Sequence, residues 1–243
     1  MLNIQKIINK PLNFEEAIEY FKEKIPVTSG EFYSIKEDYK TKAFTVSGYT
    51  SLEILKKFKD ELVKALKDGI TSGEFKNRMN DFLARKGYEG ITPYQADNIF
   101  RTNIQTAYNV GHYKQMTKPE TLKARPYWIY DAVNDRRSRP THLAMDGKVY
   151  PADHEIWDTW YPPNGYRCRC SVSTLSKRQV ELKGLKIETE IPVMVEPKGG
   201  VLRNLIPDKG FETNPAKTVF EPELSKYPMA LEKAYKKRMD KSL

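Results

Sequence analysis

The sequence predicts an α+β protein in which an N-terminal helical subdomain precedes a small, loop-rich antiparallel β module. In the first half of the chain, capping signals followed by apolar residues at helical spacing recur. From about Arg125 onward the chain is dense in Tyr, Trp, Pro, Gly and Asp and has no sustained helical period. A group of His, Cys and Asp residues in that second stretch makes the β module a candidate for stabilisation by zinc.

Composition and charge limit the classes of function. The chain has 243 residues, 39% of them apolar and 30% charged, which is enough to bury a sizeable core. No apolar run approaches the roughly 18 residues of a membrane helix, and the first residues lack a secretory signal layout. We therefore expect no membrane partner and a chain that stays in the compartment where it is made. The net charge of +9 suits contact with DNA phosphates or an acidic protein surface, and it also fits ordinary solubility.

The first predicted helix begins at Asn13, a capping residue with a carboxylate three places later. Apolar residues follow it at helical spacing, and Pro26 is expected to stop the helix. Residues 43–46 are expected to be extended and to end at Gly48. This N-terminal helix and its linker, residues 1–42, form the first predicted segment.

Three further helices are predicted from capping boxes at Thr50, Thr71 and Thr92. Gly69 is placed to end the first of them. The last carries proline at its first helical position and is expected to end before Pro119. Helices with one apolar face and short connections pack together, so residues 43–120 are predicted to be a helical subdomain.

The β module is predicted for residues 121–215. A buried strand is expected at 127–130, and Asp146-Gly147 indicates a hairpin turn. From Tyr166 to Val172 alternate residues are apolar, which is typical of a half-buried strand, and residues 187–195 are expected to add another. Residues 216–243 are strongly charged and are predicted to be a tail with one terminal helix.

One cluster in the β module could carry chemistry. Cys168 and Cys170 are two residues apart, so in a strand both sulfurs would point to the same face, and a disulfide between them would be strained. His142 would join them from the preceding loop, and Asp135, His154 or another carboxylate could supply a fourth ligand. The sequence therefore allows a structural zinc site. It also allows the simpler interpretation that both cysteines are small buried core residues and His142 a hydrogen-bonded loop histidine.

The segment around Arg136, Arg137 and Arg139 also allows two interpretations. Three arginines on one loop could bind phosphate groups or a carboxylate-rich partner. They could equally neutralise Asp131 and Asp135 nearby. We take the three arginines as candidates for a contact loop.

Enzymatic interpretations are weaker. A cysteine of this pair with His142 could form a nucleophile and base, but no orienting amide can be identified. The aspartates and His142 could hold a divalent metal for a nuclease, although Asp-rich loops are more often turns. No phosphate-binding glycine loop, nucleophile elbow or zinc-protease helix is present.

Several motifs resemble the Mu F-like minor head proteins of tailed phages. The resemblance spans about residues 40–215, with motifs in the same order and spacing. The matching stretches are residues 44–48, 100–109, 127–142, 146–149, 157–170 and 207–215. The family's histidine and cysteine pair fall on His142, Cys168 and Cys170, which we expect to hold the β module together. At His154 the family commonly has proline, which weakens His154 as a ligand.

The resemblance implies a structural role in the phage head and no catalysis. Such proteins are present in few copies, associate with the portal protein and the procapsid interior, and influence DNA packaging or ejection. We therefore expect contacts with portal, with scaffold or capsid proteins and with the DNA backbone, in the host cytoplasm during assembly and then in the virion head. The alternative is a phage-encoded, metal-dependent nuclease or toxin that uses the His/Cys/Asp cluster.

Overall fold

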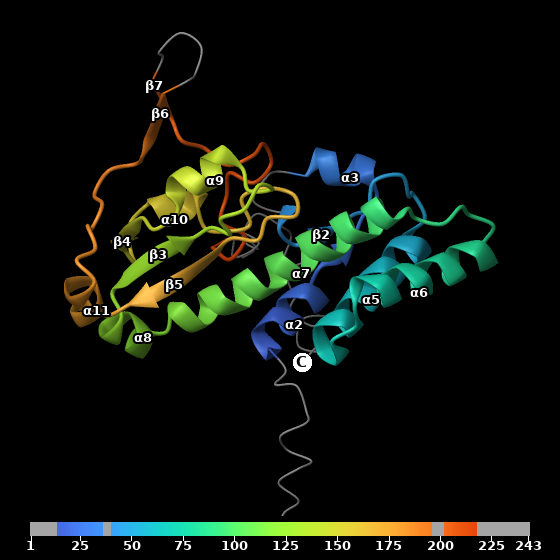
Figure 1. The fold of residues 1–243 in the computed structure, drawn as a ribbon. Coiled ribbons are helices and arrows are strands. Elements are labelled where there is room, and N and C mark those ends of the chain that lie inside the picture. Colours follow the sequence, from blue (N-terminus) through green and yellow to red (C-terminus); the bar gives the residue numbers. More distant parts are fainter. Residues whose placement is uncertain (1–13, 36–39, 196–201, 218–243) are drawn as a thin grey trace, which may run out of the picture.

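The structure, a computed structural model, describes residues 14–35, 40–195 and 202–217 (Figure 1). The helical part comes first along the chain. Its elements are α2 (Glu15–Lys22), β1 (Ile25–Pro26), α3 (Ser29–Ser34), β2 (Ala43–Phe44), α5 (Leu52–Asp68), α6 (Ser72–Arg85) and α7 (Pro93–Met116). Strands β1 and β2 form a short parallel pair, and α2, α5, α6 and α7 pack against one another.

The second part is built around a three-stranded antiparallel sheet in the order β4-β3-β5. Its elements are α8 (Pro119–Ala124), β3 (Tyr127–Asp131), α9 (Pro140–Met145), β4 (Val149–Pro151), α10 (Ile156–Thr159), β5 (Ser171–Leu175), α11 (Lys177–Leu182), β6 (Val193–Val195) and β7 (Leu202–Asn204). Strands β6 and β7 pair antiparallel as a separate hairpin that projects from the rest of the molecule (Figure 1). The α+β class with a small antiparallel sheet is confirmed.

Local sequence signals explain the helix boundaries. Thr71 and Thr92 each form a complete capping box with the residue three places later. Gly69 ends α5 in the left-handed conformation, with φ of 69°, which glycine adopts without steric cost. The cap of α5 differs from the prediction: Ser51 rather than Thr50 accepts the hydrogen bond, from the Ile54 N–H.

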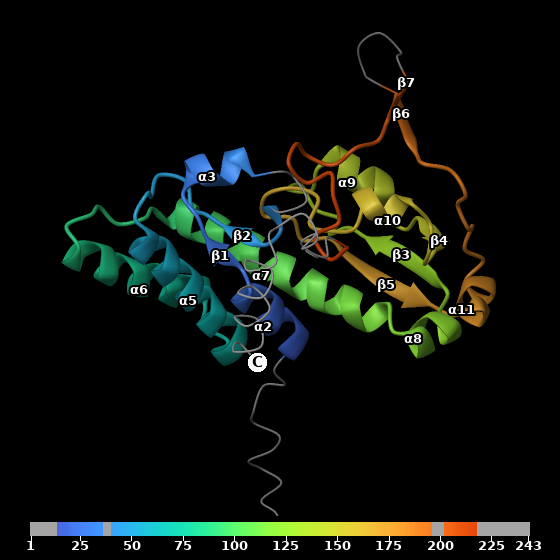
Figure 2. The ribbon, with the colours of Figure 1, turned by 180° about the vertical axis from the view of Figure 1, so that it is seen from behind.

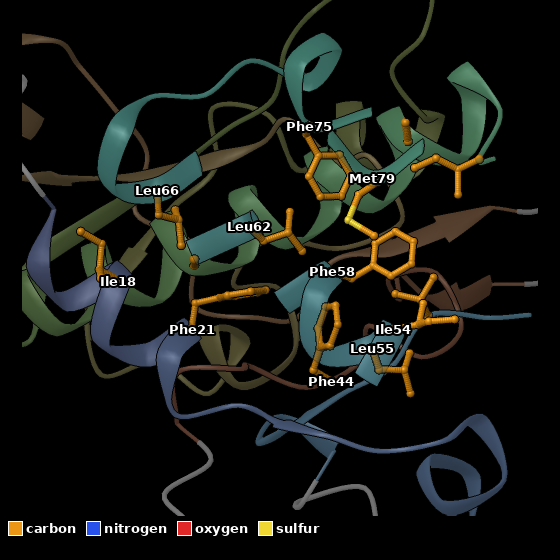
Figure 3. Packing of buried hydrophobic residues seen from close by; sticks show 14 of the residues in the cluster. Ile18, Phe21, Phe44, Ile54, Leu55, Phe58, Leu62, Leu66, Phe75 and Met79 are labelled. Atoms are coloured by element: carbon orange, nitrogen blue, oxygen red, sulfur yellow. The ribbon is translucent and has the colours of Figure 1, made fainter. Parts of the chain in front are cut away.

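The apolar faces of α2, α5, α6 and α7 meet in one cluster, which we call the helical core (Figure 3). Its members are aliphatic side chains and phenyl rings with almost no polar atoms. They include Ile18, Phe21, Phe44, Ile54, Leu55, Phe58, Leu62, Leu66, Phe75 and Met79. Burying each large side chain contributes about 2 kcal/mol before the entropy cost of ordering it. Gly111 lets α7 approach α2 closely, because a Cβ there would lie 2.8 Å from the Ala17 backbone nitrogen.

A second cluster lies beneath the three-stranded sheet, and we call it the aromatic core. It contains all three tryptophans of the chain, several tyrosines and both cysteines. Its members are Met116, Trp128, Tyr130, Ala132, Met145, Tyr150, Ile156, Trp157, Trp160, Tyr161, Cys168, Cys170, Val172 and Leu205. Buried Trp N–H and Tyr O–H groups need acceptors. Accordingly Trp157 and Trp160 donate to the carbonyls of Pro151 and Leu205, each at 2.9 Å.

Helix α7 belongs to both cores, and it runs along the side of the sheet in both views (Figures 1 and 2). It packs on α5 and α6, and its C-terminal half packs on α2 through Gly111. Near its C-terminal end, Tyr113 makes edge contacts with Trp128 and Tyr161, and the Tyr161 hydroxyl donates to the Asn109 carbonyl at 2.9 Å. The sheet is therefore fixed directly on the helical part.

Three predictions about the β module are wrong in detail. Asp146-Gly147 does form a turn, but the turn joins helix α9 to β4 and not two strands. Residues 166–170 are a loop, and the strand begins only at Ser171. Of residues 187–195, only 193–195 form a strand, while Ile187 makes a single bridge to Val149.

In the helical part, Pro26 does not end the first helix. That helix ends at Lys22, and Pro26 lies in β1. The predicted cap Asn13 and the predicted terminal helix lie outside the described residues, and the division into four segments stays a prediction. Within the described ranges, no helix combines the length and the apolar character that crossing a bilayer requires.

Candidate metal centre

Helix α9 places His142 in the interior of the β module. Pro140 stands at the first helical position, where its missing N–H costs nothing. His142 is 2% exposed, and its ring lies edge-on to Trp160 with ring centres 6.0 Å apart. The Nε2 atom of His142 has no hydrogen-bond partner among the described residues. The other ring nitrogen, Nδ1, is the atom that faces the two cysteines.

The cysteines are carried by the loop that precedes β5. Arg167 adopts the left-handed conformation, with φ of 58°, and the Cys168 N–H turns back to the Gly165 carbonyl. This turn explains why the predicted strand alternation does not hold here. Helix α7 holds the loop at two points: the Arg167 N–H donates to the Thr102 hydroxyl, and the Gln105 amide donates to the Cys170 carbonyl.

This loop brings both sulfurs to the same nitrogen of His142. The Sγ atoms of Cys168 and Cys170 lie 3.8 and 3.4 Å from His142 Nδ1, and the three atoms all lie within 4.8 Å of one another. With zinc–nitrogen and zinc–sulfur bonds of about 2.0 and 2.3 Å, two ligands of one tetrahedral ion are about 3.5 Å apart. The two nitrogen–sulfur separations are therefore compatible with one shared zinc ion.

The electrostatics of the cluster also suit a cation. The pKa of the Cys168 thiol is lowered from its ordinary value, first by the hydrogen bond with Cys170 and then by that with His142, although burial opposes the shift. The pKa of the Cys170 thiol is raised, because it faces the Cys168 sulfur in a buried site. Two thiolates so close together are stable only beside a positive charge, and a metal ion can supply that charge.

Asp135 lies outside this cluster. Both of its carboxylate oxygens accept hydrogen bonds of 2.7 Å from the Arg169 guanidinium. This pairing, together with the hydrogen bond from the Arg137 N–H, holds the pKa of Asp135 well below its usual range. His154 is also elsewhere: its Nδ1 accepts from the Ile156 N–H, and its Nε2 lies 3.2 Å from the Thr189 carbonyl. Among the described residues, the cluster thus has three ligands.

The three arginines of the candidate contact loop are not equivalent. Arg136 and Arg137 are exposed, and Arg137 lies 3.7 Å from the Asp135 carboxylate. Arg139 is half-buried, forms an ion pair with Asp208 at 2.8 Å and donates to the Tyr166 carbonyl. Arg137 therefore partly neutralises Asp135, as one of the two interpretations of the sequence expected. Arg139 instead connects the loop to Asp208, which lies far along the chain.

Sequence reasoning missed Arg169 as the partner of Asp135. It also missed the two residues of α7 that hold the cysteine loop, Thr102 and Gln105. The available signal was the charge of Arg169, a basic residue between two cysteines in a segment rich in aspartates.

The chain matches one protein family. The profile of the family described as "Phage Mu protein F like protein" matches residues 56–173, from α5 to β5, and so includes His142, Cys168 and Cys170. No solved structure matches the chain significantly.

Two curated relatives support the same assignment. The "Mu-like prophage FluMu F protein" of Haemophilus influenzae is 36% identical over 170 residues, which cover 65% of this chain and 41% of that protein. The "Putative capsid assembly protein F" of Escherichia phage Mu is 30% identical over 242 residues, which cover 85% of this chain and 55% of that protein. The chain thus spans about half the length of these relatives. On the family match and these two relatives, the chain belongs to the family of phage Mu protein F-like proteins.

Proposed function

We propose that this protein acts in the assembly of a tailed-phage head, as a minor head protein that works through contacts with other head proteins. The observation that carries the proposal is the relationship over 85% of the chain to a protein named as a putative capsid assembly protein. The portal, the scaffold or capsid proteins and the DNA backbone are the proposed partners, and the virion head is the proposed location.

Exposed side chains on the described surface support a contact role. Arg136 and Arg137 project into solvent, and the large rings of Tyr94 and Tyr166 are 67% and 59% exposed. Arginine and tyrosine are enriched at protein interfaces, where they combine apolar area with hydrogen bonding. A surface that leaves such residues open to solvent suits a protein that docks onto others.

The test is mass spectrometry of gradient-purified heads and procapsids from the parent phage or an induced lysogen. We expect this chain at a few to a few tens of copies per particle, consistent with association with a symmetric ring. Absence from every assembly stage, with the protein free in the lysate, would contradict the head role.

Incubation with plasmid DNA and RNA plus magnesium, manganese or zinc tests the alternative function, a metal-dependent nuclease or toxin. Cleavage that His142→Ala abolishes would favour a nuclease.

We further propose that His142, Cys168 and Cys170 hold a zinc ion that stabilises the aromatic core. The separations between the two sulfurs and His142 Nδ1 support this site. Both cysteines are nearly buried, at 3% and 4% exposure, which suits a structural role better than attack on a large substrate. Metal binding of this kind contributes directly to folding free energy.

The zinc proposal is tested by metal analysis and thermal melting with matched variants. The purified protein should carry about one zinc ion per chain, and a chelator should lower its melting temperature. His142→Gln should lose the metal, whereas His154→Gln, which changes a histidine outside the cluster, should keep it. Absence of stoichiometric zinc together with a melting temperature that chelators leave unchanged would contradict the site.

A further inference from the structure

A small hollow lies beside the His142–Cys168–Cys170 cluster and opens toward the surface. It has a volume of about 20 Å³, which is room for roughly one water molecule. All three cluster residues contribute to its lining.

The rest of the lining is unusually basic. Arg137, Arg139, Arg167 and Arg169 all contribute to the wall, and no described acidic residue does. Three of these arginines are held in place from outside the hollow: Arg139 by Asp208, Arg167 by Asp97 and Arg169 by Asp135. The carboxylates therefore orient the guanidinium groups around the hollow without occupying it.

Arg137 differs from the other three. Its side chain is 78% exposed, and among the described residues its ion pair is a long one of 3.7 Å to Asp135. Because Asp135 is already bound by both nitrogens of Arg169 at 2.7 Å, Arg137 is free to turn toward an incoming anion. Arg136, its neighbour in sequence, is exposed but does not line the hollow.

We propose that a metal ion at this cluster keeps its fourth coordination position open toward the hollow, and that the position accepts a carboxylate oxygen from an acidic protein surface. The inference rests on the zinc centre proposed above. Three protein ligands with an exchangeable fourth one are a common zinc arrangement, and Asp and Glu oxygens are regular zinc ligands. The space admits about one oxygen atom, and guanidinium groups at the rim can bind the second carboxylate oxygen.

This arrangement would make the centre part of an interface. A carboxylate donated by a partner would complete the coordination sphere, so docking and metal coordination would strengthen each other. The β module would then be stabilised when the protein is assembled.

The experiment uses the full chain loaded with Co²⁺, whose visible absorption bands report the number and kind of ligands. Acetate is titrated in at constant ionic strength, with sodium perchlorate as the weakly coordinating balance. We expect a saturable change in the Co²⁺ bands with acetate and none with perchlorate alone. Bands that acetate leaves unchanged, in a protein that has taken up Co²⁺, would overturn the open position. Failure to take up Co²⁺ at all would instead overturn the metal centre itself.

Two further arms identify the ligand and the role of the rim. Inorganic phosphate in place of acetate should change the bands less, and a stronger response to phosphate would overturn the carboxylate assignment. Arg137→Gln should weaken acetate binding about fivefold and leave the starting bands unchanged. The matched variant Arg136→Gln should bind acetate like the unaltered protein, and equal weakening by both variants would overturn the part assigned to Arg137.

Discussion

The helical core and the aromatic core differ in how their side chains are held. Apart from Tyr20, the buried residues of the helical core are aliphatic side chains, phenyl rings and Met79, which pack by shape and need no hydrogen-bond partners. The aromatic core consists largely of Trp and Tyr and of a His/Cys/Cys cluster. The polar atoms of its Trp and Tyr side chains, except Trp128 Nε1, reach backbone carbonyls or Asn164. The first core follows from apolar periodicity. The second depends on individual hydrogen bonds between distant segments, so single polar atoms matter there.

This comparison can be tested with two optical probes. All three tryptophans, Trp128, Trp157 and Trp160, belong to the aromatic core, so tryptophan fluorescence reports on that region. The long helices α5, α6 and α7 dominate the far-ultraviolet circular dichroism. The two signals therefore follow the two regions separately in one unfolding experiment.

The largest expected effect is that of Phe58→Ala in the helical core. Phe58 is fully buried and contacts the rings of Tyr49 and Phe75. We expect a loss of about 3–5 kcal/mol in unfolding free energy, measured by urea titration with both probes. Because α7 belongs to both cores, both midpoints should fall together. Leu52→Ala, at an exposed position on the same helix, should change little. A fluorescence midpoint that stays unchanged in Phe58→Ala would mean that the cores unfold independently.

The second prediction concerns Lys24, which is buried at the edge of the helical core. Burial, with smaller contributions from Lys42 and Lys59, lowers the pKa of Lys24 to about 7. The unfolded chain, with an ordinary lysine pKa, then binds more protons than the folded protein between about pH 7 and pH 10. Stability of the unaltered protein should therefore rise with pH in this range relative to Lys24→Met, by roughly 1 kcal/mol per pH unit.

Urea titrations at several pH values measure this difference. At pH 7 Lys24→Met should be more stable than the unaltered protein. The gain in unfolding free energy is reduced because the variant lacks the hydrogen bond of 2.7 Å that Lys24 donates to the Thr41 carbonyl. Its advantage should shrink as pH rises. The exposed substitution Lys56→Met should show no such trend. A difference between Lys24→Met and the unaltered protein that stays constant with pH would contradict the prediction.

A smaller effect is expected for Tyr161→Phe in the aromatic core. The change removes only the hydroxyl that donates to the Asn109 carbonyl on α7. Because the acceptor stays buried, we expect a loss of about 1.5 kcal/mol, measured by tryptophan fluorescence during urea unfolding. Tyr166→Phe, where the ring is 59% exposed, serves as control and should be neutral. Equal stability of Tyr161→Phe and its control would show that polar atoms matter less in this core than the comparison states.

The smallest effect is expected for Thr92→Ala at the start of α7. The Thr92 hydroxyl accepts from the Gln95 N–H, and the Gln95 side chain accepts from the Thr92 N–H. Loss of this cap should reduce stability by about 1 kcal/mol, seen in thermal melting by circular dichroism. Thr28→Ala removes the same type of cap from the six-residue helix α3, which has no buried residues, and should cost less. The opposite order would contradict the view that α7 supports both cores.

The helical part is easier to predict from sequence than the β module, because its structure depends on local interactions and that of the β module on contacts between distant segments. Helix starts at Thr71 and Thr92 and the end at Gly69 follow from interactions within one turn of chain, so the sequence alone predicts them. Residues 166–170 were predicted as a strand and form a loop. Their alternation of apolar and polar residues is compatible with either conformation. Contacts with Thr102 and Gln105 of α7, more than 60 residues away, favour the loop.

The candidate metal site shows the same division. The residue types and the two-residue spacing of the cysteines indicated His142, Cys168 and Cys170 as a group, and the three are adjacent in the fold. The choice of Asp135 as fourth ligand followed from its chemistry alone. In the folded chain both oxygens of its carboxylate are bound by Arg169 instead, and Asp135 lies outside the group formed by His142 and the two cysteines.

By itself, the sequence determined the α+β class, the helical periodicity, the caps and the family, because each of these depends on local order or on motifs in a fixed succession. Only the tertiary structure decided which polar atoms find partners, which residues line the hollow beside the cluster and which of its arginines is most exposed. Those outcomes depend on distances between segments far apart along the chain. A hydrogen bond or a metal ligand requires those distances to be right within a few tenths of an ångström.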